Sequence, residues 1–82
     1  MGIINDFEEI SSVNSDVLRE KLSGLPNDTI VKASMGTSPE NAEYLSSALS
    51  NIDFAKKREN IGRIRIEEVE AAQQEIIKAI NQ

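Results

Sequence analysis

The chain has 82 residues, roughly the size of one small domain. It carries 9 Lys and Arg residues against 14 Asp and Glu residues, for a net charge of −5, and it contains no His and no Cys. These absences exclude disulfide scaffolds, thiolate or imidazole metal sites, and cysteine or serine–histidine nucleophiles. We therefore expect a single acidic domain over residues 1–82 that is not an enzyme, with no catalytic residues, no metal and no cofactor.

The sequence contains no signal for a membrane or for export. No apolar run approaches the roughly 18 residues that a membrane span needs. The start Met1–Asp6 lacks the charged and apolar regions of a signal peptide. The Met-Gly myristoylation pattern requires Ser or Thr where this chain has Asp6. The predicted location is the cytoplasm, without direct membrane insertion.

The first half of the chain is divided by Gly and Pro into short helical segments. Residues 6–10 can form one helical turn. Ser15 is predicted to cap a helix over residues 16–23, which Gly24 ends in the left-handed conformation. Asn27 is predicted to cap a helix over residues 28–35, which Gly36 ends in the same way.

Gly and Pro also divide the second half of the chain into short segments. Thr37 or Ser38 caps a helix that has Pro39 in its first turn, where the missing N–H needs no partner. Residues 50–53 have the form of a capping box and lead into a basic helix over residues 54–60, which Gly62 ends. Residues 63–66 alternate polar and apolar side chains and are expected to form a buried extended connector. Apolar side chains three or four apart predict a helix over residues 67–80.

These segments predict an all-α fold, a compact bundle of five to six short helices. Tyr44 and Phe54 are expected in the core or at an interface. The predicted core contains the apolar side chains on the inner face of each segment: Phe7, Ile10, Leu18, Leu22, Leu25, Ile30, Ala33, Leu45, Leu49, Ile52, Ile61, Ile64, Ile66, Val69, Ile76 and Ile80.

Charge is unevenly distributed along the chain. Residues 56–65, which we call the basic segment, hold five cationic residues against Glu59, a net charge of +4, so that the other 72 residues carry −9. Such a dipolar surface can steer a protein partner of reversed charge pattern. The alternative is a solvated helix face. The predicted partner-binding residues are Lys56, Lys57, Arg58, Glu59, Arg63 and Arg65.

Other uses of charged residues fit the sequence less well. Binding of nucleic acid is not expected, because the rest of the domain is negative and no stacking aromatic residues flank the basic segment. The carboxylate pairs Glu8–Glu9 and Glu67–Glu68 stand where acids ordinarily stabilise helix starts, so acid–base catalysis is not expected from them.

Three stretches of the chain resemble one protein family. Residues 62–76, Gly-Arg-Ile-Arg-Ile-Glu-Glu-Val-Glu-Ala-Ala-Gln-Gln-Glu-Ile, are similar to the Gly-Pro-Val-Arg-Leu-Ser-x-Val-Glu-x-x-Gln-x-x-Ile signature in the C-terminal domain of the flagellar motor switch protein FliG. Residues 7–10, Phe-Glu-Glu-Ile, resemble the Phe-Glu-Asp-Leu at the start of that domain. Residues 25–36 resemble its Val-Asp-x-x-x-Leu-x-x-Ala-Leu-Lys-Gly segment. The resemblance covers essentially the whole chain.

The resemblance implies a helical bundle with right-handed packing on the cytoplasmic rim of the rotor of the bacterial flagellum, which serves motility and chemotaxis. In the family, one charged helix faces the cytoplasmic loop of the stator, and torque passes through complementary charges. The implied partners are that stator loop or other rotor and switch proteins. The implied location is the cytoplasmic face of the inner membrane, at the flagellar basal body.

The charged face departs from the family pattern at several positions. The family's functional Lys falls on Met35, and the Arg of its torque helix falls near Ile52. Arg65 matches the Arg of the Gly-Pro-Val-Arg motif directly, Arg63 replaces the Pro, and Glu59 is the nearest acid to the family's Asp pair. The resulting hypothesis is a non-enzymatic, torque-transmitting interaction domain. The alternative is a stand-alone assembly module that has been repurposed for self-association or for another cytoplasmic partner.

Overall fold

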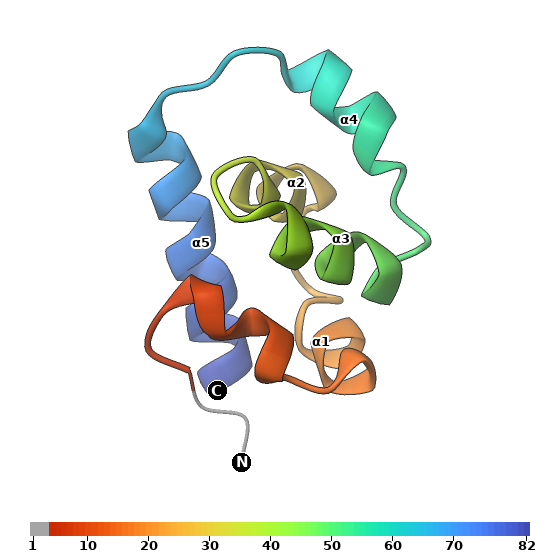
Figure 1. Ribbon diagram of the computed structural model, residues 1–82, viewed down its shortest axis with the longest axis vertical. Helices are drawn as coiled ribbons and strands as arrows, with labels where there is room; N and C mark the ends of the chain where they lie inside the picture. Colours follow the sequence, from red (N-terminus) through yellow and green to blue (C-terminus); the bar gives the residue numbers. More distant parts are fainter. Residues whose placement is uncertain (1–3) are drawn as a thin grey trace.

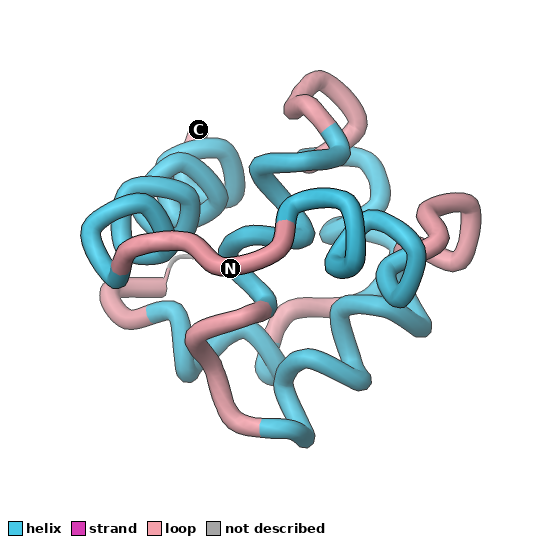
Figure 2. Tube along the Cα trace, turned by 90° about the horizontal axis from the view of Figure 1, so that it is seen from above, coloured by secondary structure: helices cyan, strands magenta, loops and turns pink. Residues whose placement is uncertain are grey.

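The computed structural model describes residues 4–82, and every regular element in that range is a helix (Figure 2). The Met1–Gly2 start, considered above as a lipidation signal, lies outside the described residues. The all-α prediction is confirmed. The elements in chain order are η1 (Phe7–Ser12), α1 (Ser15–Lys21), α2 (Asn27–Ser34), α3 (Pro39–Ala48), α4 (Phe54–Ile61) and α5 (Ile66–Asn81).

Helix starts in the first half differ from the sequence prediction by one residue. The predicted first turn is the 3-10 helix η1, and the Asp6 carboxylate accepts a hydrogen bond from the Glu8 N–H at 3.0 Å. Asn14, not Ser15, caps α1, because its Oδ1 accepts from the Asp16 N–H at 2.8 Å. Pro26, not Asn27, stands at the cap position of α2 and makes no side-chain cap bond. A neighbouring residue therefore fills the cap position that was predicted for Ser15 or Asn27.

The cap of α3 agrees with the sequence prediction, whereas α4 is capped by the last residue of the predicted capping box and not by its first. Ser38 caps α3 by accepting from the Asn41 N–H at 3.4 Å, and Pro39 follows it as the first helical residue. Asp53 caps α4 by accepting from the Lys56 N–H at 3.0 Å. The start of α4 thus lies at the end of the predicted capping box, at Asp53.

The prediction that glycines end the helices in the left-handed conformation is wrong for Gly24 and Gly36. Within residues 4–82, Gly62 is the glycine with a positive φ, 68°. Gly36 is needed for a different reason, because a Cβ atom built there would lie 2.3 Å from the Val69 Cγ1 atom of α5. Gly36 therefore allows the end of α2 to approach α5 closely.

Helix α2 lies in the middle of the bundle (Figure 1). Its most extensive contact is with α5, and it also packs against α4 and α3. The elements η1 and α1 pack against α3 and α5, around the other end of the bundle. One hydrophobic cluster connects the described elements, and Ile10, Leu18, Leu45 and Ile76 in it are completely inaccessible to solvent.

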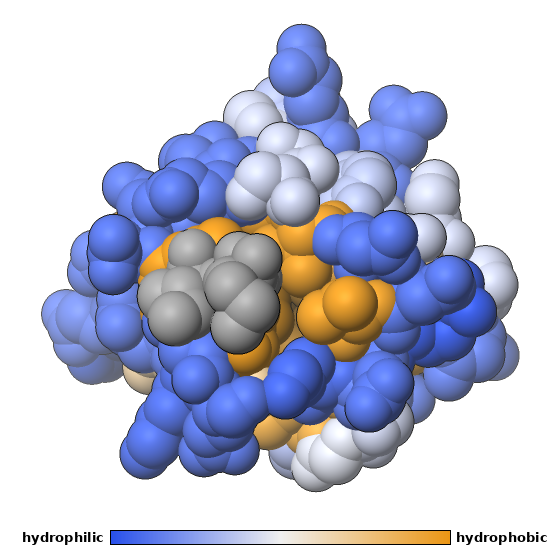
Figure 3. Space-filling view, turned by 90° about the horizontal axis from the view of Figure 1, so that it is seen from below, coloured by the Kyte–Doolittle hydropathy of each residue, from blue (hydrophilic) through white to orange (hydrophobic). Residues whose placement is uncertain are grey.

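The two ends of the described chain lie side by side. The Ile4 N–H donates to Asn81 Oδ1 at 3.0 Å, and Asn81 Nδ2 donates to the Ile4 carbonyl at 2.8 Å. Figure 3 shows the molecule from below, with an apolar area surrounded by hydrophilic side chains. Within residues 4–82, no helix is long and apolar enough to cross a membrane.

The predicted core is largely correct, with one clear error. Ile66 is 65% exposed, because it is the first residue of α5 and stands on the outer side of the helix start. Leu25, Ile61 and Ile64 are half-buried rather than buried. Phe54 is buried. The core also contains side chains that the prediction omitted: Ile4, Val13, Val31, Ala48, Ala72 and Ile77.

Two side chains of α3 form hydrogen bonds to the first part of the chain. The buried amide of Asn41 donates to Glu8 Oε1 at 2.8 Å and to the Glu8 carbonyl at 3.2 Å. The hydroxyl of Tyr44, a half-buried residue, donates to the Val13 carbonyl. Buried polar groups are tolerated when such partners satisfy them. These contacts fix α3 to η1 and to the residue that follows it.

Candidate protein-interaction surface

Helix α4 attaches to the bundle by one narrow face. Phe54, at its first position, is buried, and Ile61, at its last, is half-buried. These positions are seven residues apart and therefore lie on the same side of the helix. Gly62 then ends the helix in a backbone conformation, φ 68° and ψ −142°, that other residues rarely adopt. The rest of the α4 surface is free to carry charge.

The helical geometry separates the three consecutive cations of α4. Lys57 lies on the inner side, between Phe54 and Ile61, and its Nζ forms an ion pair with Asp28 Oδ1 of α2 at 3.1 Å. Lys56 and Arg58 are exposed. Adjacent residues of an α-helix do not face the same direction, so these three charges are spread around the helix and do not contact one another.

The remaining charges of the basic segment stand on the connector between α4 and α5. Arg63 and Arg65 are exposed, and the half-buried Ile64 between them fastens the connector to the bundle. The Arg65 N–H donates to Glu68 Oε2 at 3.3 Å, which fixes the last residue of the connector to the first turn of α5.

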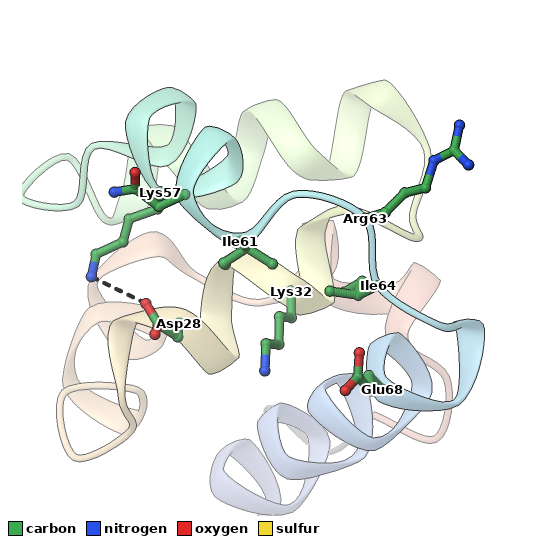
Figure 4. Close-up of a pocket in the computed structure, with 8 residues that line it drawn as sticks. Asp28, Lys32, Lys57, Ile61, Arg63, Ile64 and Glu68 are labelled. Carbon is green, nitrogen blue, oxygen red and sulfur yellow. Dashed lines mark hydrogen bonds and ion pairs between the residues drawn. The ribbon is translucent and has the colours of Figure 1, made fainter.

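A cleft of about 450 Å³ lies beneath α4 and the connector (Figure 4). Lys32 lies between Asp28 and Glu68 in this view, whereas the Arg63 side chain points away from the cleft. The cleft is therefore built from α2, α4, the connector and the start of α5. Its lining residues are Asp28, Lys32, Lys57, Asn60, Ile61, Arg63, Ile64 and Glu68.

A second hollow of about 340 Å³ involves Arg58. It is lined further by residues from the end of α2 and the start of α3, among them Met35, Thr37 and Pro39. Arg58 and Lys57 thus line two different hollows. Met35, where the family has a functional Lys, is half-buried beside Arg58.

The fold unites only part of the predicted site. Lys57 and Arg63 line the same cleft, but Lys56, Glu59 and Arg65 do not line it. Sequence reasoning missed three charged residues of the cleft, namely Asp28, Lys32 and Glu68. No local pattern marks Asp28 and Lys32, because they meet α4 only through the packing of α4 on α2. Glu68 reaches the cleft from the first turn of α5. A binding role for any of these residues stays a prediction.

The position that corresponds to the torque-helix Arg of the family cannot present a charge in this chain. Ile52 is 7% exposed and belongs to the hydrophobic core, in the loop that precedes α4. The sequence difference at this position thus has a structural counterpart, because the side chain is used for packing. The exposed charges of the basic segment begin at Lys56, in the first turn of α4.

The site has no features of a metal centre within the described part of the chain. No three Asp, Glu, His or Cys side chains of residues 4–82 come close enough to hold a metal ion.

Comparison with known proteins identifies the family. A scan against protein-family models matches residues 4–82 to the FliG C-terminal domain. Neither a search of curated proteins nor a search of solved structures returned a match. The matched family is a structural domain of the flagellar motor switch and not an enzyme family. Because the match covers nearly the whole chain, this protein belongs to the family of FliG C-terminal domains.

Proposed function

We propose that this domain works by protein–protein contact, with the basic segment as its contact face and the cytoplasmic loop of the flagellar stator as its partner. The observation that supports this proposal is the placement of a +4 segment on an exposed helix and connector, while the other 72 residues carry −9. The role is non-enzymatic, and its proposed place is the cytoplasmic side of the membrane at the flagellar basal body.

Because the charges of the basic segment are exposed, the proposed contact should depend on salt concentration. Lys56, Arg58, Glu59, Arg63 and Arg65 are all exposed, so their interactions with a partner are screened by salt over about 10 Å at 0.1 M ionic strength. Such charges accelerate encounter and fix orientation more than they add affinity. A contact that forms and breaks repeatedly as a rotor passes a stator requires this behaviour.

The test is an amide-resolved NMR titration of the domain with the stator loop of the same organism, at low and at high salt. The reversal variant carries Lys56→Glu and Arg58→Glu, because both side chains are exposed and form no ion pair among the described residues. Lys57 is left unchanged, since its reversal would place a second carboxylate beside Asp28. The matched control carries Lys21→Glu and Lys78→Glu, the same change of charge at exposed positions outside α4 and the connector.

The expected result is a set of chemical-shift changes confined to residues 52–66 that vanish at high salt. The reversal variant should lose these changes, the control should keep them, and both should retain the helical circular dichroism of the parent. Unchanged binding by the reversal variant, or the absence of any shift in the parent protein, would refute the stator contact.

Self-association is the second candidate, and one feature favours it. The acidic start of α5, with Glu67, Glu68 and Glu70, directly follows the basic segment, so positive and negative surfaces lie next to each other. Two copies of the domain can associate about a two-fold axis when the positive patch of each copy contacts the negative patch of the other. Light scattering over a range of protein concentrations would show a dimer that high salt dissociates. A monomeric mass at every concentration would eliminate this candidate.

A further inference from the structure

We propose that α4 detaches from the bundle and unwinds as a separate cooperative unit while the other helices stay folded. The unit spans residues 53–64, which are the cap of α4, the helix itself and the start of the connector. Opening of this kind needs no partner, so it is independent of the proposed function. It is a conformational device that controls when the exposed charges of α4 are held in place.

Hydrogen bonds to main-chain carbonyl groups join the other helices to one another. The donor side chains are Asn41 of α3 to Glu8 of η1 at 3.2 Å, Arg19 of α1 to Ala48 of α3 at 3.1 Å, and Gln73 of α5 to Ala33 of α2 at 3.1 Å. Within the described residues, α4 has no such bond to another helix. Its polar link is the ion pair of Lys57 with Asp28, whose side chains are partly exposed. Ion pairs of this kind contribute little to stability.

Apolar packing of α4 is also limited. The helix packs mainly against α2. Phe54 is the residue that α4 supplies to the hydrophobic cluster, and the half-buried Ile61 packs against that cluster. Between them, at residues 55–60, only Lys57 is shielded in part from solvent. Detachment therefore exposes little apolar surface beyond these two side chains.

Hollows border α4 and the loop that precedes it. Lys57 and Ile61 line the cleft of about 450 Å³ beneath the helix (Figure 4), and Arg58 lines the hollow of about 340 Å³. A third hollow, of about 530 Å³, is lined by residues 49–52 of the loop together with residues of α1 and α2. Solvent therefore reaches the contact between α4 and the bundle along its edges.

A detached α4 does not keep its helical structure. It has eight residues, and isolated helices shorter than about 12–15 residues are marginal in water. Detachment and unwinding are therefore one event. The other helices retain the α2–α5 contact and the rest of the hydrophobic cluster. Segments with few buried apolar contacts are those that open locally in native proteins.

The opening has a consequence for recognition. Lys56 and Arg58 keep a fixed position on the bundle only while α4 is docked. A partner that contacts both charges therefore binds the docked form, and its apparent affinity falls in proportion to the docked fraction. Any condition that shifts this equilibrium changes how many domains present the two charges together.

Native-state hydrogen exchange of the whole domain, followed by NMR at increasing urea below the unfolding transition, tests the proposal. The probes are the amides from Lys57, which donates to the Asp53 carbonyl at 3.0 Å, to Gly62, which donates to the Arg58 carbonyl at 3.0 Å. We expect one common protection factor for them, at least about ten-fold below that of the most protected α2 and α5 amides. Urea should lower it, but less steeply than in α5, because less surface is exposed. Unequal protection factors that do not respond to urea, or values equal to those of α5, would overturn the proposal.

Two variants show whether α4 opens without the rest of the domain. Ile76→Val removes a fully buried methyl group from α5 and should speed exchange of the most protected α2 and α5 amides about two- to ten-fold. It should leave the α4 amides unchanged, because Ile76 stays packed when α4 opens. Phe54→Leu should speed exchange of the α4 amides about five-fold. Equal acceleration of α4 and α5 by Ile76→Val, or unchanged α4 exchange in Phe54→Leu, would overturn the proposal.

Discussion

The contact between α2 and α5 and the attachment of α4 are two different ways of fixing a helix. The α2–α5 contact joins buried surfaces, with Ile30, Val31 and Ile76 essentially inaccessible to solvent. It also includes a hydrogen bond from Gln73 Nε2 to the Ala33 carbonyl at 3.1 Å. Helix α4 buries Phe54 as its one fully buried residue and carries an exposed ion pair to α2.

Because the two helices are held differently, the residues that determine stability differ from the residues that are proposed to bind a partner. Burial of apolar surface supplies most of the folding free energy, so substitutions between α2 and α5 should act on the whole domain. Exposed charges contribute little to stability, so those on α4 and the connector can change without loss of the fold. A family can therefore retain one bundle while the charges on its contact face differ among members. The predictions below test this separation.

The largest effect is expected for truncation of a buried side chain of α5. Ile76→Ala removes methyl groups from a site with 0% exposure and should lower the free energy of unfolding by about 2–5 kcal/mol. Ile66→Ala is the matched control, because it makes the same change on the same helix at 65% exposure, and it should stay within about 0.5 kcal/mol of the parent. Urea denaturation followed by circular dichroism measures both. Equal losses for the two variants would contradict the assigned burial of α5.

The next largest loss of stability is expected at Gly36, where the end of α2 closely approaches α5. Gly36→Ala places a Cβ atom 2.3 Å from Val69 Cγ1 and should destabilise the domain by about 2–3 kcal/mol. Adding Val69→Ala should recover part of that loss, because the smaller side chain removes the clash. Gly24→Ala is the control, since a Cβ atom there meets nothing within 4 Å and its φ is not positive. A neutral Gly36→Ala variant would show that the two helices are not in such close contact.

Gly62 tests the junction between α4 and the connector. Its φ of 68° is costly for any residue with a side chain, so Gly62→Ala should destabilise the domain by about 1–2 kcal/mol. The substitution adds only a methyl group, and nothing lies within 4 Å of a Cβ atom there, so the cost comes from the backbone alone. Thermal unfolding measures the loss, with Gly24→Ala as the reference. A stability equal to that reference would mean that the connector adopts another backbone conformation.

The sequence predicted what depends on local pattern. The three- and four-residue spacing of apolar side chains placed the last helix at residues 67–80, and the observed α5 is Ile66–Asn81. Ser38 was one of two predicted caps, because a side-chain oxygen before a helical run is itself a local signal. The predicted capping box began at Ser50, three residues before the observed cap, Asp53. Ile66 was misplaced, since four alternating residues do not show where an extended connector ends and a helix begins.

The features that the sequence did not reveal depend on contacts between distant segments. Gly36 was interpreted as a helix terminator, but its role follows from Val69, which lies on another helix. Asp28 and Lys32 have the appearance of ordinary solvated residues of α2 until α4 packs above them. The run of cations in residues 56–58 suggested one surface, whereas helical geometry places Lys57 and Arg58 at two different hollows and Lys56 at neither of them. Three of the eight residues that line the cleft therefore lie outside the basic segment and join it through tertiary packing.

The smallest effect is expected at the ion pair between α4 and α2. Lys57 and Asp28 have side chains that are 40% and 57% exposed, so water and salt screen their attraction. A double-mutant cycle with Lys57→Ala and Asp28→Ala should give a coupling free energy below about 1 kcal/mol, which vanishes at high salt. The pair of Arg19 and Asp16, also exposed, serves as a local reference within one helix. A coupling of several kcal/mol that survives salt would break the distinction between the two regions, because α4 would then contribute to the stability of the bundle through the same residue that lines its cleft.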